Sequence, residues 1–174
     1  MPSNDGRSYA PLTTNHLKRL ARFVSKEHQA WSDARHDLKG QLVAGCLAQG
    51  AAQHFLDGRT GVKDFDLWLF YDRSHLAKGI REHGVRSTGD FGPSVFDRYP
   101  DDPETFVGRR IDFMCRRLPT NVPREPPDAA VMAWLQSDNQ SPMWLRKKPV
   151  IMLWPTTYHG VVIWNPDGER LASQ

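Results

Sequence analysis

Three aspartates in two apolar segments are the residues of this 174-residue chain best suited to chemistry. Asp64 and Asp66 stand one residue apart in residues 62–71, a run that is aromatic and aliphatic like a central strand. Because alternate residues of a strand point to the same face, both carboxylates would project together, about 7 Å apart. Asp112 is the third, inside a second apolar segment at residues 110–115.

Carboxylates inside apolar strands repel one another and lose hydration, and a divalent cation removes both costs. Mg²⁺, or Mn²⁺ in its place, is a hard cation that binds carboxylate oxygens together with substrate phosphates. If the two strands are neighbours, the three carboxylates form one cluster that suits a pair of such ions. We therefore expect Asp64, Asp66 and Asp112 to be metal ligands.

The same aspartates also have a purely structural interpretation. Asp64 could cap a turn, and Asp112 could pair with Arg110 or Arg116, which alternation places on its own strand face. The functional alternative for these arginines is neutralisation of a triphosphate or pyrophosphate beside the metal site. Ion pairing at the end of a strand is an equally good explanation.

A glycine stands between a predicted strand and a predicted helix. Residues 41–48 are short and apolar like a buried strand, and residues 51–56 begin a helix. Gly50 lies between them, where the absence of a side chain lets the backbone approach a phosphate. The helix N-terminus that follows favours an anion, so we expect a phosphate site here.

This order of elements resembles the nucleotidyltransferase superfamily, which has the DNA polymerase β-like fold. The family pattern is a hydrophobic residue, Gly, and Gly or Ser, then a short gap, then Asp-hydrophobic-Asp-hydrophobic, and later an acid between hydrophobic residues. Here the matching segments are Gln49-Gly50-Ala51, the gap 52–63, Asp64-Phe65-Asp66-Leu67 and Ile111-Asp112-Phe113. The resemblance covers about residues 41–118.

The resemblance implies that Gly50 and Ala51 line the triphosphate, that Asp64 and Asp66 bind metal, and that Asp112 binds metal or acts as the base. The implied activity transfers a nucleoside monophosphate from ATP or another nucleoside triphosphate to an unidentified acceptor, a small molecule, RNA or protein, with release of pyrophosphate. Two residues depart from the family pattern. Ala51 replaces Ser or Gly, and Gln49 replaces an apolar residue, which predicts a weaker hold on phosphate.

Two other functions are compatible with these residues. A catalytically weak or inactive module of the same fold would bind a nucleotide or a protein partner, as a regulator or an antitoxin-like protein does. A metal-dependent hydrolase would use the same acids on phosphate esters. The basic run at residues 146–148 could contact an acceptor polynucleotide, although such runs are more often solvated connections.

The elements that must position these residues fit one α/β domain, a mixed sheet flanked by helices. Residues 1–11 are expected to form a flexible tail, and residues 12–174 a single nucleotidyltransferase-like domain. Its core would span about residues 41–118, and a C-terminal helix and β-hairpin would form an appendage at 119–174. A helix beginning after Thr13 or Thr14, a short helix at 74–83 and an irregular stretch at 85–105 complete the prediction.

Composition excludes several classes of protein. Lys and Arg exceed Asp and Glu by only three, which is too small an excess to argue for nucleic-acid binding by itself. No run approaches the length of a membrane-spanning helix, and the first residues are polar rather than signal-like. Cys46 and Cys115 lie in apolar runs and are expected to be free core residues. We expect a cytoplasmic protein without a membrane partner.

Overall fold

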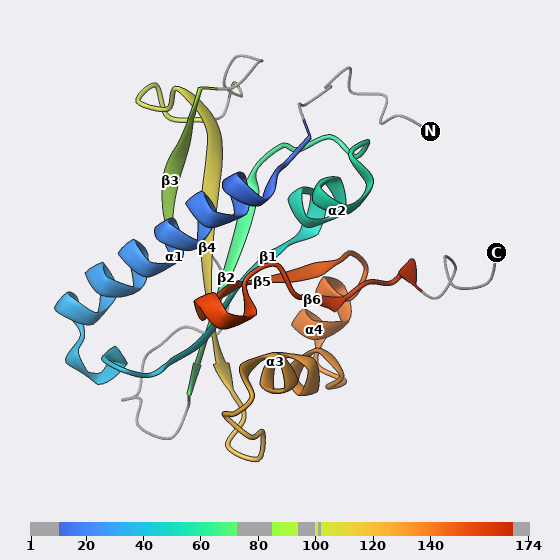
Figure 1. Cartoon of the computed structure of the whole chain (residues 1–174). Coiled ribbons are helices and arrows are strands. Elements are labelled where there is room, and N and C mark those ends of the chain that lie inside the picture. Colours follow the sequence, from blue (N-terminus) through green and yellow to red (C-terminus); the bar gives the residue numbers. More distant parts are fainter. Residues whose placement is uncertain (1–10, 73–84, 94–99, 101, 169–174) are drawn as a thin grey trace.

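The computed structural model describes residues 11–72, 85–93, 100 and 102–168. Its centre is one six-stranded sheet with the strand order β3-β4-β2-β1-β5-β6 (Figure 1). β2 and β4 are parallel, and the other neighbouring pairs are antiparallel. The expected mixed α/β architecture is therefore confirmed. The strands are β1 (Leu42–Ala48), β2 (Phe65–Asp72), β3 (Val85–Pro93), β4 (Gly108–Leu118), β5 (Val150–Trp154) and β6 (Val162–Trp164).

Helices cover both faces of the sheet, as Figure 1 shows. α1 (Thr14–Ala34) and α2 (Gln49–Asp57) pack on one face, and α3 (Pro127–Leu135) and α4 (Gln140–Leu145) pack on the other. Each face has its own apolar core, because successive strand residues point to opposite sides. Two short 3₁₀ helices lie at His36–Leu38 and Thr156–Tyr158.

The longest helix, α1, follows directly from its sequence. Thr13 is the N-cap, and its hydroxyl accepts a hydrogen bond from the backbone of His16, as expected for this residue type. The buried residues of α1 recur with helical spacing and face the sheet. The helix passes so close to β1 that a Cβ on Gly45 would lie 2.5 Å from Cγ1 of Val24. Gly45 is therefore needed for this helix–sheet contact.

Several elements differ from the sequence expectations. The stretch at 85–105 was expected to be irregular, but residues 85–93 form β3, an edge strand held by β4 through irregular pairing. The hairpin assigned to a C-terminal appendage is an integral part of the sheet, since β5 pairs with β1. α4 is an additional helix before this hairpin. The first ten residues and the expected helix at 74–83 lie outside the described residues.

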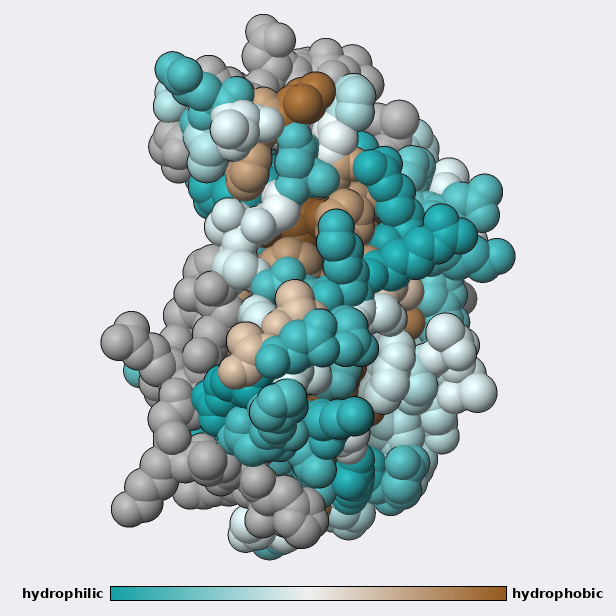
Figure 2. Space-filling view, turned by 90° about the vertical axis from the view of Figure 1, so that its left-hand side faces the viewer, coloured by the Kyte–Doolittle hydropathy of each residue, from teal (hydrophilic) through white to brown (hydrophobic). Residues whose placement is uncertain are grey.

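The surface near the β3 edge is largely polar. Most of the coloured residues in Figure 2 are hydrophilic, with hydrophobic residues visible among them in the upper half of the view. A polar edge discourages pairing with a strand from another molecule. Both cysteines are buried, as expected. Among the described helices, none combines the length and the apolar composition needed to cross a membrane.

Candidate functional site

The structure brings the three sequence-predicted aspartates together at one end of the sheet. β2 and β4 are parallel neighbours, and Asp66 lies directly opposite Asp112 in their register. Neighbouring strands are about 4.8 Å apart, so the two side chains leave the same face side by side. Asp64 lies one residue before β2 begins, at the entrance to the strand rather than in its interior.

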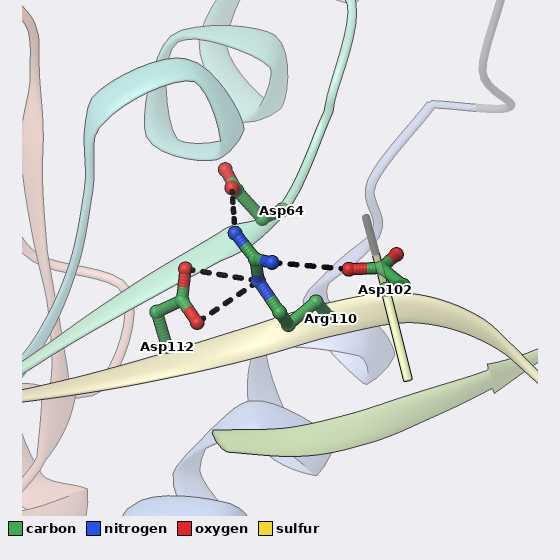
Figure 3. A network of polar contacts seen from close by, with 4 residues as sticks. All are labelled: Asp64, Asp102, Arg110 and Asp112. Carbon is green, nitrogen blue, oxygen red and sulfur yellow. Dashed lines mark hydrogen bonds and ion pairs between the residues drawn. The ribbon is translucent and has the colours of Figure 1, made fainter. Parts of the chain in front are cut away.

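Arg110 on β4 lies in the middle of this acidic cluster (Figure 3). Its Nε is 3.0 Å from Oδ1 of Asp112, and one terminal nitrogen is 3.5 Å from Oδ2 of Asp64. The other terminal nitrogen donates to Oδ1 of Asp102 over 3.1 Å. The structure therefore contains the ion pair between Asp112 and Arg110 that the structural interpretation of the sequence anticipates.

The cluster carries more negative than positive charge. Burial, together with the nearby carboxylates of Asp64 and Asp112, raises the pKa of Asp66 to about 7 against the opposing effects of Arg110 and Lys148. Burial also raises the pKa of Asp64 and of Asp112, with Arg110 as the main opposing charge. One guanidinium does not fully compensate these carboxylates.

Asp66 differs from the other members of the cluster in its contacts. Its side chain is half-buried, and among the described residues no hydrogen bond or ion pair reaches its carboxylate. A buried carboxylate normally has such a partner, because an uncompensated charge is costly to bury. Asp66 is therefore the position in the cluster where an additional cation would be most favourable.

The donor atoms fit a hard cation, but the side chains are not arranged around one. The described residues contain no group of three or more His, Cys, Asp or Glu side chains positioned to hold a metal ion. Asp64 and Asp112 are directed toward Arg110 instead. Carboxylate oxygens are nevertheless the ligands that Mg²⁺ and Mn²⁺ prefer, and Asp66 offers one without a partner.

The turn between β1 and α2 lies beside the acids, because Ala48 at the end of β1 pairs with Asp66. α2 begins at Gln49, whose φ of 61° is unusual for a residue other than glycine. The special backbone position of the turn is therefore Gln49, and Gly50 lies within the first turn of the helix. A Cβ on Gly50 would meet only the carbonyl oxygen of Gly61, at 3.6 Å.

The side chains of this turn leave backbone N–H groups and one amide as donors. Ala51 is 1% exposed, and its methyl group belongs to the core beneath α1. Only its backbone N–H is left to contact a phosphate. The side-chain Nε2 of Gln49 is buried without a hydrogen-bond partner among the described residues. Free backbone N–H groups at a helix N-terminus, together with this amide, are donors suited to an anion.

Arg116 does not join the acidic cluster. Its guanidinium carbon lies 4.4 Å from the ring centroid of Trp68, and Nη1 donates to the carbonyl of Cys115 over 2.9 Å. The residue is 7% exposed and stands four positions along β4 from Asp112. Of the two predicted arginines, Arg110 is the one that contacts Asp64, Asp102 and Asp112.

Two charged residues of the site were missed. Asp102 is 6% exposed and pairs with Arg110, but nothing in its local sequence distinguishes it from other loop aspartates. Lys148, the last residue of the basic run, lies close enough to lower the pKa of Asp66. The basic run itself was the only sequence signal for Lys148, and it could not show which surface the run faces.

Comparison with known proteins identifies no relative: no protein-family model matches the chain, and neither a curated protein nor a solved structure shows a match. The function of the chain must therefore be inferred from its own residues and their geometry.

Proposed function

We propose that the chain is a metal-dependent nucleotidyltransferase that transfers a nucleoside monophosphate from a nucleoside triphosphate to an acceptor hydroxyl. The observation that carries this proposal is the direct opposition of Asp66 and Asp112 on the parallel strands β2 and β4. Asp64 stands at the entrance to the same strand pair, and the N-terminus of α2 begins beside it. Carboxylates and an anion-binding helix end thus lie at one end of the sheet.

In this proposal the chain binds the triphosphate at the start of α2. The backbone N–H groups of Gly50 and Ala51 and the amide of Gln49 would donate to phosphate oxygens. Arg110 would stabilise the charge that develops on the departing pyrophosphate. Asp64, Asp66 and Asp112 would hold a divalent cation, which supplies charge neutralisation at the phosphates when bound.

The reaction is a single displacement at the α-phosphorus. The acceptor oxygen forms a new bond to phosphorus while the bond to the pyrophosphate oxygen breaks, and pyrophosphate leaves with the bonding electrons. The hydroxyl proton passes to a carboxylate of the cluster, and Asp112 is the one assigned to this role. Its pKa is raised by burial, which makes it a better proton acceptor than an exposed aspartate.

A nucleotide-binding module without catalytic activity, with a regulatory or antitoxin-like role, is the second candidate. The ion pairs of Arg110 favour it, because they already neutralise part of the acidic cluster without a metal ion. Such a module would bind a nucleoside triphosphate at the α2 N-terminus and release no pyrophosphate. Measurements of binding and of turnover therefore separate the two candidates.

The deciding experiment measures pyrophosphate release and label transfer from α-labelled nucleoside triphosphates with Mg²⁺ or Mn²⁺. Water, small hydroxyl compounds, RNA and the protein itself would be offered as acceptors. Asp66→Asn should lower the rate at least about a hundredfold, the scale for losing one electrostatic stabiliser of a transition state. Asp33→Asn is the matched control, because Asp33 is exposed on α1 and its carboxylate accepts a hydrogen bond from Gln29 on the same helix.

Circular dichroism would show that both variants fold. Release of pyrophosphate that survives Asp66→Asn would show that the site is wrongly assigned. Calorimetric binding of a triphosphate with no release under any condition would support the inactive module instead.

A further inference from the structure

A cavity of about 560 Å³ lies next to the acidic cluster on the same face of the sheet. Its floor includes Trp68 of β2 and Met114 of β4, which pair with one another in the strand register. These residues follow Asp66 and Asp112 by two positions, so about 6.6 Å of strand separates the acids from the floor. A small molecule bound in the cavity would therefore extend directly to the carboxylates.

The floor of this cavity is aromatic and cationic. Trp68 is 1% exposed, and the guanidinium of Arg116 lies over its indole ring. The indole and the guanidinium thus give the cavity a floor that favours a flat π-system over an aliphatic group.

The wall is formed by α4, which leaves large apolar side chains exposed. Met143 is 51% and Trp144 48% exposed, and both line the cavity. The Trp144 ring lies 6.4 Å from that of Trp68, in a tilted orientation. Gln140 adds a polar group that can both donate and accept hydrogen bonds. An exposed indole beside a polar amide is a good surface on which to stack a planar heterocycle.

The subsites follow one another along the strands. The N-terminus of α2 comes first, beside Ala48, then the pair of Asp66 and Asp112, and then the aromatic cavity. A nucleoside triphosphate has the same order of groups: the β- and γ-phosphates, the α-phosphate, the sugar and the base. We propose that this cavity binds the nucleobase of the donor nucleotide, an assignment that rests on the proposed transfer reaction.

Other small ligands fit these features less well. A free phosphate would not fill the cavity or use its indoles, and an aliphatic chain would not stack on the exposed indole of Trp144. A nucleobase supplies a stacking face for Trp144 and hydrogen-bonding edges for Gln140. The volume also lies within the range of ordinary small-molecule pockets.

The test uses nucleosides without phosphate, in EDTA, so that neither the phosphate subsite nor a metal ion contributes to binding. Adenosine, guanosine, cytidine and uridine would be titrated into the full chain and followed by calorimetry and tryptophan fluorescence. At least one of them should bind, and Trp144→Ala should weaken that binding about tenfold, the loss of one stacked base. Trp144→Phe should restore most of it. Leu56→Ala, at a residue 39% exposed on α2, is the control and should leave binding unchanged.

Absence of nucleoside binding, or equal affinity in the Trp144→Ala variant, would overturn the assignment even if pyrophosphate release is observed. If nucleosides bind and the binding depends on Trp144, but the protein releases no pyrophosphate, the nucleobase assignment stands and the proposed transfer reaction is overturned. The two proposals can therefore fail separately.

Discussion

Asp66→Asn should make the metal-free protein more stable above pH 7. The substitution removes a half-buried carboxylate that has no hydrogen-bond or ion-pair partner among the described residues. It also relieves the repulsion that Asp66 shares with Asp64 and Asp112. Most substitutions at partly buried positions destabilise a protein, so a gain in stability here would be a specific signature of a site arranged for ligand binding.

The magnitude follows from the pKa of Asp66, which burial and the neighbouring carboxylates raise to about 7. Because this pKa is raised, the folded protein holds a proton between about pH 4 and pH 7 that the unfolded chain releases. The stability contributed by that proton is lost as the pH rises through this window. A rise of this size corresponds to roughly 4 kcal/mol of folding stability lost at pH 8, an upper bound for a partly solvated group. In the variant the asparagine amide itself lacks a hydrogen-bond partner, which costs about 2 kcal/mol. The expected net gain in the free energy of unfolding is therefore about 2 kcal/mol.

Urea unfolding in EDTA at pH 5 and pH 8 measures this gain. The wild-type protein and the Asp66→Asn variant should differ clearly at pH 8 and much less at pH 5, with equal dependence on urea concentration. Asp33→Asn controls for the loss of a carboxylate from an exposed position. Added Mn²⁺ should then stabilise the wild-type protein at pH 8 and leave the Asp66→Asn variant almost unchanged.

Two results would refute the reasoning. If the variant is less stable than wild type at pH 8, the Asp66 carboxylate has a compensating partner in solution. If the difference is the same at both pH values, the effect comes from packing rather than from the ionisation of Asp66. Either result would also remove the main electrostatic argument for a cation at this position.

Three further substitutions test separate parts of the structure. Arg110→Gln should lower the free energy of unfolding at pH 8 by about 2 kcal/mol, because it leaves part-buried carboxylates uncompensated. Added Mn²⁺ should restore the lost stability in a thermal-shift assay, and no restoration would count against a shared cation site. Gly50→Ala should leave the free energy of unfolding within about 0.5 kcal/mol of wild type, since the added Cβ meets no close neighbour. The same substitution should weaken triphosphate binding measured by calorimetry, and unchanged binding would place the phosphates elsewhere. Gly45→Ala should lower the free energy of unfolding in urea by about 1–3 kcal/mol. Adding Val24→Ala in a double variant should recover part of that loss, because it removes the clash. If the effects of the two substitutions simply add, the close packing of α1 on β1 is contradicted.

Local patterns in the sequence predicted the elements that carry the acids. The apolar runs around Asp66 and Asp112 are long and β-branched or aromatic enough to indicate strands, and both strands are present. The sequence could not show that these strands are parallel neighbours in register, because that pairing joins residues 46 positions apart. The prediction of a cluster was therefore conditional on a long-range contact that only the structure supplies.

Features that local patterns do not encode were missed. β3 contains two glycines and several polar residues, and it is a strand because β4 supplies its hydrogen bonds. The left-handed backbone of the turn falls on Gln49, a residue type that does not indicate such a conformation, and Gly50 lies within the first turn of the helix. Asp102 joins the site through a tertiary ion pair, and no periodicity or motif marks it.

The ion pairs of Arg110 show how an acidic cluster could be tolerated in the absence of substrate and still be used when substrate binds. Among the described residues the guanidinium contacts Asp64, Asp102 and Asp112 and compensates part of their charge, whereas Asp66 has no hydrogen-bond or ion-pair partner. A triphosphate and a cation would arrive together with opposite charges. Arg110 could then pair with phosphate oxygens while the carboxylates turn to the cation, so each charge exchanges one partner for another. Substrate binding by such an exchange leaves no buried charge uncompensated, and it requires a guanidinium at position 110 as well as carboxylates at 64, 66 and 112.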